Sequence, residues 1–216
     1  MENIITVNHS SLVIKNDTIL NDINVAFEKG KIHGLIGRNG SGKTMLMKCI
    51  CGFMKVTSGE IRVNGKIVGK EVDFPQEIGF IIETPGFIPY YSGFKNLYLL
   101  AGLRNKIGKK EIADAMTAVG LDYRLKRSVK KYSLGMRQRL GIAQAIMEKP
   151  AILILDEPFN GLDKEGVDQM REYFLKLKEE GTTIVICSHS SDDIRYLCDT
   201  VYEMDKGRLN RKEISE

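Results

Sequence analysis

The sequence predicts an α/β protein whose parallel sheet is covered on both faces and is interrupted by a helical insertion. The apolar run at 151–155 is continuous, which is typical of a strand buried in a parallel sheet, and 182–187 is expected to be a second buried strand. A glycine-rich turn at 37–44 lies between an apolar strand and an apolar-periodic helix. We expect an α/β core at 1–85 and 149–208, a helical insertion at 86–148 and a polar tail at 209–216.

The first part of the chain predicts an N-terminal antiparallel β subdomain. Short strands with apolar alternation are expected at 3–7, 11–14 and 23–27, and turn residues follow the second and third of them. A hairpin is expected around Asn64-Gly65, because this dipeptide is a strong two-residue turn signal. A further buried strand is expected at 78–83.

Helical periodicity predicts most of the remaining elements. In the insertion, one helix follows Ser92, a second ends with Gly120 as its C-cap, and a third opens near Gly135 and stops before Pro150. After the insertion we expect a strand at 151–155, a helix at 164–180, a strand at 182–187, a helix at 191–198 and a strand at 201–204.

The stretch from Gly37 to Thr44 is the most specific chemical signal. It reads Gly-x-x-x-x-Gly-Lys-Thr between a strand and a helix, which is the setting of a phosphate-binding loop. The glycines let backbone N–H groups form an anion-binding nest at the positive end of the helix dipole. Lys43 is expected to reach the β- and γ-phosphates of a nucleoside triphosphate, and Thr44 to bind Mg²⁺. The expected nucleotide contacts are Gly37, Arg38, Asn39, Gly40, Ser41, Gly42, Lys43 and Thr44.

Two acidic residues and a histidine form the expected second half of this site. The run ILILDEP places Asp156 and Glu157 at the carboxyl end of a buried strand, where open α/β sheets bind ligands. Asp156 is expected to hold Mg²⁺ through its water shell, and Glu157 to polarise a water for attack on the γ-phosphorus. His189 follows the next buried strand and is expected to donate to a γ-phosphate oxygen.

Simpler interpretations exist for each part of this site. The glycine-rich turn could be an ordinary one, the two acids could be solvated, and a lone histidine is more often structural. A chance match to the phosphate-loop pattern in a chain of this length has odds on the order of one per cent. We therefore expect a nucleoside triphosphate site at these positions.

Composition argues against several classes of protein. The net charge of +4, from 32 basic and 28 acidic residues, is too small to indicate a nucleic-acid footprint. The four cysteines lie in apolar surroundings without a C-x-x-C pair, which suggests buried thiols in a reducing cytoplasm. The apolar runs are too short to span a bilayer, and the first residues lack the features of a secretion signal.

In their order along the chain, these motifs resemble those of the ATP-binding subunits of ABC transporters. The resemblance covers roughly residues 2–208 and implies a P-loop NTPase (RecA-like) core within a single ABC ATPase domain. It implies that Lys43, Glu157 and His189 are catalytic. The matching motifs are GRNGSGKT (37–44, Walker A), YSLGMRQRL (132–140, the signature segment usually written LSGGQ), ILILDEP (152–158, Walker B), NGLD (160–163, D-loop) and Ser188-His189 (the switch-histidine loop).

The resemblance also implies partners. Ser133 and Gly135 precede a helix whose N-terminus can meet a phosphate, and in the family that phosphate belongs to ATP held by the opposite subunit. The resemblance thus implies a head-to-tail homodimer, or pairing with a homologous ATPase, in which Asp163 of the D-loop also contacts nucleotide. A simple N-cap by Ser133 is the structural alternative, and both interpretations can hold at once.

Three departures from the family pattern bear on function. In the signature, Leu134 replaces the first glycine and Met136 the glutamine. Glu83 stands where the family has the Q-loop glutamine, and its carboxylate could contact Mg²⁺. The aromatic residue that usually stacks on adenine is absent, and its position falls near Val13 or Ile14, where apolar contact could replace stacking. The expected nucleotide contacts in this part of the chain are Ile14 and Thr18.

The segment IIETPGFIPYYSGFKNL (81–97) together with the signature looks most like the ATPases of the bacitracin-resistance and lantibiotic-immunity type. This implies ATP hydrolysis that powers export of an antimicrobial peptide or similar compound through a separate membrane subunit, at the cytoplasmic face of the membrane. The aromatic residues at 87–91 either receive that subunit or pack internally. The alternative function is a soluble or regulatory ABC-type nucleotide-binding module with little hydrolysis.

Overall fold

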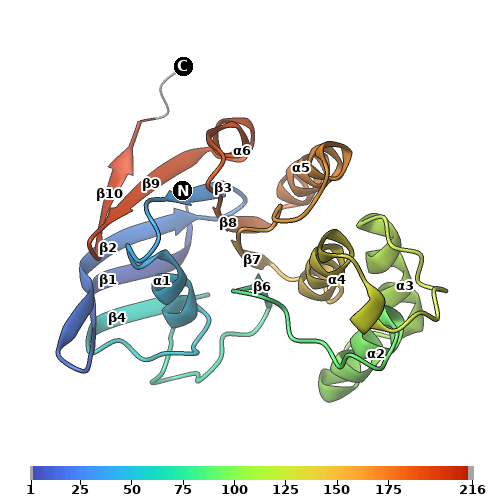
Figure 1. Ribbon diagram of the computed structural model, residues 1–216. Helices are drawn as coiled ribbons and strands as arrows, with labels where there is room; N and C mark the ends of the chain where they lie inside the picture. Colours follow the sequence, from blue (N-terminus) through green and yellow to red (C-terminus); the bar gives the residue numbers. More distant parts are fainter. Residues whose placement is uncertain (1, 214–216) are drawn as a thin grey trace.

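The computed structural model describes residues 2–213 and confirms an α/β protein built on two sheets (Figure 1). The first sheet is antiparallel, in the order β2-β1-β4-β5, and the second has six strands in the order β10-β9-β3-β8-β7-β6. In the second sheet only β10 runs antiparallel to its neighbour. The strands are β1 (Asn3–Ile14), β2 (Asp17–Glu28), β3 (Ile32–Ile36), β4 (Ser58–Val63), β5 (Lys66–Ile67), β6 (Ile78–Ile81), β7 (Ile152–Asp156), β8 (Thr183–Cys187), β9 (Thr200–Asp205) and β10 (Arg208–Lys212).

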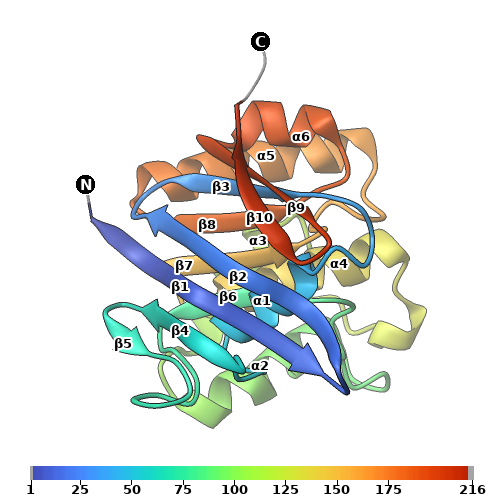
Figure 2. The same cartoon turned by 90° about the vertical axis from the view of Figure 1, so that its left-hand side faces the viewer.

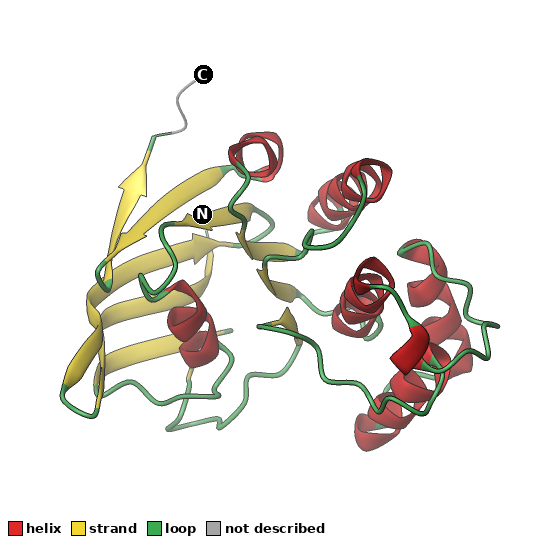
Figure 3. Cartoon of the chain, in the orientation of Figure 1, coloured by secondary structure: helices red, strands yellow, loops and turns green. Residues whose placement is uncertain are grey.

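The helices form three groups around these sheets. Helix α1 (Lys43–Ile50) lies between the two sheets, whereas α5 (Lys164–Glu179) and α6 (Ser191–Leu197) cover the other face of the six-stranded sheet (Figures 1 and 2). Figure 3 shows that the helices between β6 and β7 gather on the side away from the antiparallel sheet. These are α2 (Gly93–Arg104), α3 (Lys109–Ala118), the 3-10 turn η1 (Val129–Lys131) and α4 (Leu134–Ile146).

The central strands are buried on both faces, as their continuous apolar sequences predict. In β7, Ile152 and Ile154 belong to the apolar cluster with α1, whereas Leu153 and Leu155 belong to the cluster with α4 and α5. Fully burying each such side chain is worth about 1.5–3 kcal/mol. The strand ends, where the loops leave the sheet, are therefore held by two separate cores.

The N-terminal strands are longer than the sequence predicts. The expected strands at 3–7 and 11–14 form one strand, β1, with an irregular register between Val7 and Ser10. The hydroxyl of Ser10 is buried there and donates to the carbonyls of Asn8 and Glu60. A bulge thus absorbs the polar stretch that looked like a break in the sequence.

The C-terminal segment also differs from the expectation. A polar tail is predicted from residue 209, but Arg208–Lys212 forms strand β10, which pairs with β9. Because most of its side chains are exposed, the strand has no apolar alternation that sequence reasoning could detect. Residues 214–216 of the predicted tail lie outside the described residues. Across residues 2–213, no helix combines the length and apolar character needed to cross a bilayer.

Candidate active site

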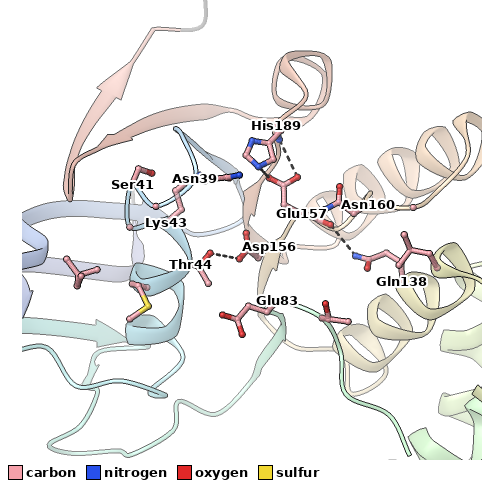
Figure 4. A pocket seen from close by; sticks show the side chains of 17 residues that line it. Asn39, Ser41, Lys43, Thr44, Glu83, Gln138, Asp156, Glu157, Asn160 and His189 are labelled. Atoms are coloured by element: carbon pink, nitrogen blue, oxygen red, sulfur yellow. Dashed lines mark hydrogen bonds and ion pairs between the residues drawn. The ribbon is translucent and has the colours of Figure 1, made fainter. Parts of the chain in front are cut away.

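A cavity of about 770 Å³ lies where the carboxyl ends of the parallel strands face the helical insertion. Figure 4 shows its labelled side chains, which come from the turn after β3, the start of helix α1, the end of β7, the loops after β6, β7 and β8, and helix α4. This is the edge at which an open α/β sheet binds ligands. The residues that line it are Ile19, Asn39, Gly40, Ser41, Gly42, Lys43, Thr44, Met45, Glu83, Thr84, Leu134, Gln138, Asp156, Glu157, Asn160, Gly161 and His189.

The predicted phosphate loop forms one wall of the cavity. Gly37 has φ 140°, and a Cβ there would lie 2.2 Å from the carbonyl oxygen of Met204, so only glycine fits. The ammonium of Lys43 is buried and donates to the carbonyls of Gly37 (2.7 Å) and Arg38 (3.1 Å). The buried hydroxyl of Ser41 has no hydrogen-bond partner among the described residues. A positive group and free donors therefore converge at the start of α1, as anion binding requires.

Thr44 and Asp156 meet on the floor of the cavity. The hydroxyl of Thr44 donates to Asp156 Oδ2 at 2.7 Å, although the residues are more than a hundred positions apart. Both side chains offer hard oxygen ligands beside the phosphate loop. No cluster of three or more His, Cys, Asp or Glu side chains suited to a metal occurs within residues 2–213. This donor set fits Mg²⁺, which usually takes one or two protein oxygens and completes its shell with phosphates and water.

Glu157 and His189 face each other across the loops after β7 and β8 (Figure 4). The ring nitrogen Nε2 of His189 lies 3.2 Å from Glu157 Oε1, and the backbone N–H of His189 donates to Glu157 Oε2 at 3.4 Å. Burial raises the pKa of Glu157, and the charge of His189 opposes that rise only in part. Glu157 Oε1 is buried and accepts no hydrogen bond of good geometry from the described residues. A carboxylate with a raised pKa and a free acceptor is suited to act as a general base.

Glu83 lies on the cavity wall at the end of β6, but its carboxylate is mostly exposed. It accepts from Lys48 Nζ at 2.7 Å, and Lys48 belongs to helix α1. The predicted contact of Glu83 with Mg²⁺ stays a prediction, because the carboxylate is here paired with an ammonium group.

The signature segment reaches the cavity through only part of its sequence. Ser133 caps α4 by accepting from the Met136 N–H at 3.1 Å, which confirms the N-cap interpretation. Leu134 is exposed and lines the cavity, whereas Ser133 and Gly135 do not. Gly135 instead contacts Gly161, since a Cβ on Gly135 would lie 2.6 Å from the Gly161 carbonyl oxygen. Ser133 and Gly135 are therefore not placed to contact a nucleotide in the cavity of their own chain.

Other predicted residues have different places. Ile14 and Thr18 do not line the cavity, and Ile19 of the same hairpin does so instead. Its carbonyl oxygen would lie 3.1 Å from a Cβ on Gly42, so Ile19 sits directly beside the phosphate loop. Asp163 is exposed and caps α5, accepting from the Gly166 N–H at 2.9 Å.

Sequence reasoning also missed part of the wall. Gln138, Asn160 and Thr84 line the cavity without having been expected there. Asn160 lies inside the recognised D-loop, so the motif itself could have indicated it. Gln138 lies about one turn into α4, inside the recognised signature segment, but that motif did not by itself indicate a place on the cavity wall. Met45 and Gly161, together with Ile19 and Leu134, complete the unexpected set.

The aromatic segment at 87–91 divides between core and surface. Phe87 packs against the apolar cluster of the insertion, and Tyr91 is half-buried with Lys95 Nζ 4.4 Å from its ring centroid. Ile88 and Tyr90 are exposed, Tyr90 by 80%. Phe87 therefore packs internally, whereas contact of Ile88 and Tyr90 with the membrane subunit stays a prediction.

The comparisons with known proteins agree with this site. Residues 20–160 match the family model described as ABC transporter. The chain is 45% identical over 93% of its length to the ABC transporter ATP-binding protein YybJ of Bacillus subtilis, covering 92% of that protein. It is 42% identical to the bacitracin transport ATP-binding protein BcrA of Enterococcus faecalis, covering 97% of this chain and 68% of BcrA. It is 39% identical to the lantibiotic transport ATP-binding protein SrtF of Streptococcus pyogenes, covering 89% and 82%.

The fold is also that of solved ATP-binding cassettes. The dimeric post-hydrolysis structure of the cassette MJ0796, bound to ADP and phosphate, superposes with a TM-score of 0.88. That match covers 98% of this chain and 99% of the other at 20% sequence identity, so it shows the fold. With the phosphate loop, Glu157 and His189 gathered at one cavity, the chain belongs to the ABC transporter family, as one of its ATP-binding and ATP-hydrolysing subunits, which associate with a membrane partner.

Proposed function

We propose that this chain hydrolyses ATP in the presence of Mg²⁺ and thereby drives export of an antimicrobial peptide or a similar compound through a separate membrane subunit. The observation that carries the proposal is the single cavity at which the phosphate loop, the Thr44–Asp156 pair and the Glu157–His189 pair meet. The names of BcrA and SrtF, which describe transport of bacitracin and of a lantibiotic, support the substrate class.

The chemistry follows from the positions of these groups. Thr44 and Asp156 would hold Mg²⁺, which neutralises phosphate charge when bound. Lys43 and the N–H groups at the start of α1 would bind the phosphates. Glu157 accepts a proton from the attacking water, and His189 donates a hydrogen bond to the γ-phosphate. Positioning and charge neutralisation supply most of the rate in phosphoryl transfer.

A head-to-tail dimer would complete the site. Leu134 is 57% exposed at the mouth of the cavity, and the Ser133 hydroxyl lies outside it at the N-terminus of α4. These groups are free to meet a nucleotide held by a second copy. In that arrangement ATP joins the two copies, and loss of phosphate after hydrolysis lets them separate.

The surface proposed for the membrane subunit is a groove between core and insertion. Phe53 and Phe74 are exposed by 46% and 61%, and their ring centroids are 5.9 Å apart. They line a hollow of about 350 Å³ together with Phe80 and Arg104, and the exposed Leu103 lines the adjoining groove. Exposed aromatic patches of this kind mark interaction sites. An amphipathic helix of a membrane protein at the cytoplasmic face fits this shape and polarity.

The first experiment separates hydrolysis from binding alone. Purified wild type should release phosphate from ATP–Mg²⁺, and Glu157→Gln should bind ATP but lose about 10²-fold or more of the turnover. Failure of the wild type to hydrolyse ATP, with binding intact, would favour the regulatory module. Chelation of Mg²⁺ by EDTA should abolish turnover in the wild type.

The second experiment tests coupling to the membrane. The chain should sediment with membranes only when a compatible membrane subunit is co-expressed. Phe53→Ser with Phe74→Ser should abolish that association, whereas Val13→Ser, an exposed apolar residue on β1, should not. Tyr90→Ala with Tyr91→Ala should uncouple ATPase activity from transport. Loss of ATP binding in this last variant would refute the coupling role of the two tyrosines.

A further inference from the structure

Gln138 is buried between the signature helix and the loop that carries the catalytic carboxylate. Its side chain is 8% exposed, and Nε2 donates to the Glu157 carbonyl at 3.2 Å and to the Pro158 carbonyl at 3.0 Å (Figure 4). The side-chain amide nitrogen of Gln138 thus donates to the carbonyls of two consecutive residues. The side chain also reaches the wall of the nucleotide cavity.

The backbone that Gln138 binds has an uncommon conformation. Glu157 has φ 51°, in the left-handed region that residues with a Cβ seldom adopt. Its N–H donates to the Cys187 carbonyl at 3.1 Å, and its own carbonyl accepts from the Asn160 N–H at 3.3 Å as well as from Gln138. Such a conformation persists only where the surroundings fix it, and Gln138 supplies side-chain bonds on the side of the insertion.

A second contact joins the same two segments. Gly135, in the first turn of α4, approaches the Gly161 carbonyl so closely that a Cβ would lie 2.6 Å from it. Helix α4 therefore touches the loop after β7 at two points, one before and one beyond Phe159. A displacement of α4 moves this loop with it, because close-packed segments do not deform independently.

We propose that Gln138 is a positioning residue that ties the signature helix to the catalytic carboxylate of the same chain. It holds the Glu157 backbone so that the carboxylate faces His189. The inference rests on the proposed function in one respect, namely that the N-terminus of α4 meets the nucleotide of a second copy. Engagement of that nucleotide then aligns Glu157 in the chain that provides α4, and so links the two sites of the dimer.

The test compares Gln138→Met, which keeps the length of the side chain but donates nothing, with Gln144→Met on the same helix. Gln144 is half-buried and lies outside the nucleotide cavity. Gln138→Met should lower kcat about 10- to 100-fold, as expected when a catalytic group is displaced by up to about 1 Å from its productive position. Its KM, its Kd for ATP and its melting temperature should stay near those of the wild type. Gln144→Met should match the wild type in all four measurements.

Two further variants separate positioning from general destabilisation. In a double variant with Glu157→Gln, the Gln138→Met change should cause no additional loss of kcat, because the first residue acts through the second. In Gln138→Glu, an ionised carboxylate cannot donate, but a protonated one can donate a single O–H. Its rate relative to wild type should therefore rise as the pH falls, whereas the relative rate of Gln138→Met should stay constant.

Certain results would overturn the inference. Wild-type kcat in Gln138→Met would do so, as would a loss of kcat that only follows a fall in melting temperature. Independent, multiplicative losses in the double variant would also contradict it. If the wild type itself fails to hydrolyse ATP, the proposed function falls first. If Glu157→Gln abolishes turnover and Gln138→Met leaves it intact, the role of Gln138 alone is refuted.

Discussion

The contact between Gly135 and Gly161 can be broken by a single methyl group. A Cβ on Gly135 would lie 2.6 Å from the Gly161 carbonyl oxygen, whereas ordinary contacts begin near 3.4 Å. Gly135→Ala therefore requires a shift of about 0.8 Å between the first turn of α4 and the loop after β7. Neither side is a flexible side chain, so backbone must move.

The expected cost follows from this shift. Overpacking of this kind destabilises a protein by about 1–3 kcal/mol. Displacement of an aligned catalytic group by about 1 Å can lower a rate by about 10²-fold. We expect Gly135→Ala to lose between about 10-fold and 10²-fold of its ATPase rate at saturating ATP. Binding of ATP by the phosphate loop of the same chain should change little, because Lys43 and Thr44 lie on a different segment.

Gly102→Ala provides the matched control. Gly102 is an exposed residue of helix α2, and a Cβ there meets nothing within 4 Å. Alanine should stabilise that helix by about 0.5–1 kcal/mol and leave turnover unchanged. Phosphate release, ATP binding by fluorescence and thermal unfolding are the three measurements. If Gly135→Ala hydrolyses ATP and melts as the wild type does, the contact with Gly161 does not constrain the site.

Three other substitutions test separate parts of the structure. Lys43→Ala should weaken ATP binding by about 10- to 100-fold in a calorimetric titration, since charge-assisted hydrogen bonds are worth about 1.5–3 kcal/mol. Asp193→Asn should lower stability in urea unfolding by about 3 kcal/mol. Among the described residues it leaves the partly buried Arg171 with only Asp168, 3.3 Å away, as a counter-ion, and it weakens the bond between buried Asp193 and Ser188 beside His189. Burial raises the pKa of Glu157, so folding favours its protonated form and stability falls as pH rises through the raised pKa. Glu157→Gln should therefore melt above the wild type at pH 8, and the difference should vanish near pH 4; an equal difference at both values would contradict the raised pKa.

The parts of the site that the sequence predicts well are contiguous. The phosphate loop is one run of eight residues whose strand, glycines and helix specify their own geometry, and the structure keeps it intact from Gly37 to Thr44. Asp156 and Glu157 were predictable for a similar reason, because the end of a buried strand fixes their direction. In both cases local sequence and tertiary position agree.

Contacts that depend on distant packing were not predictable. Ile19 reaches the site because β2 is longer than its apolar pattern indicates and passes beside Gly42. Gln138 belongs to the recognised signature segment, but only the closeness of α4 to the Glu157 carbonyl gives it a role. Strand β10 carries almost no apolar residues, so pairing with β9 rather than burial stabilises it.

Glu83 shows how a departure from a family motif can be balanced elsewhere in the chain. A carboxylate at the end of β6 places a negative charge near Asp156, which would disfavour the binding of phosphate. Lys48, on the helix that begins at the phosphate loop, pairs with Glu83 at 2.7 Å. With Glu83 64% exposed, this ion pair contributes at most about 1 kcal/mol to stability. The ion pair therefore matters more for the electrostatics of the cavity than for the stability of the fold, because Lys48 offsets the negative charge of Glu83 that would otherwise repel a triphosphate.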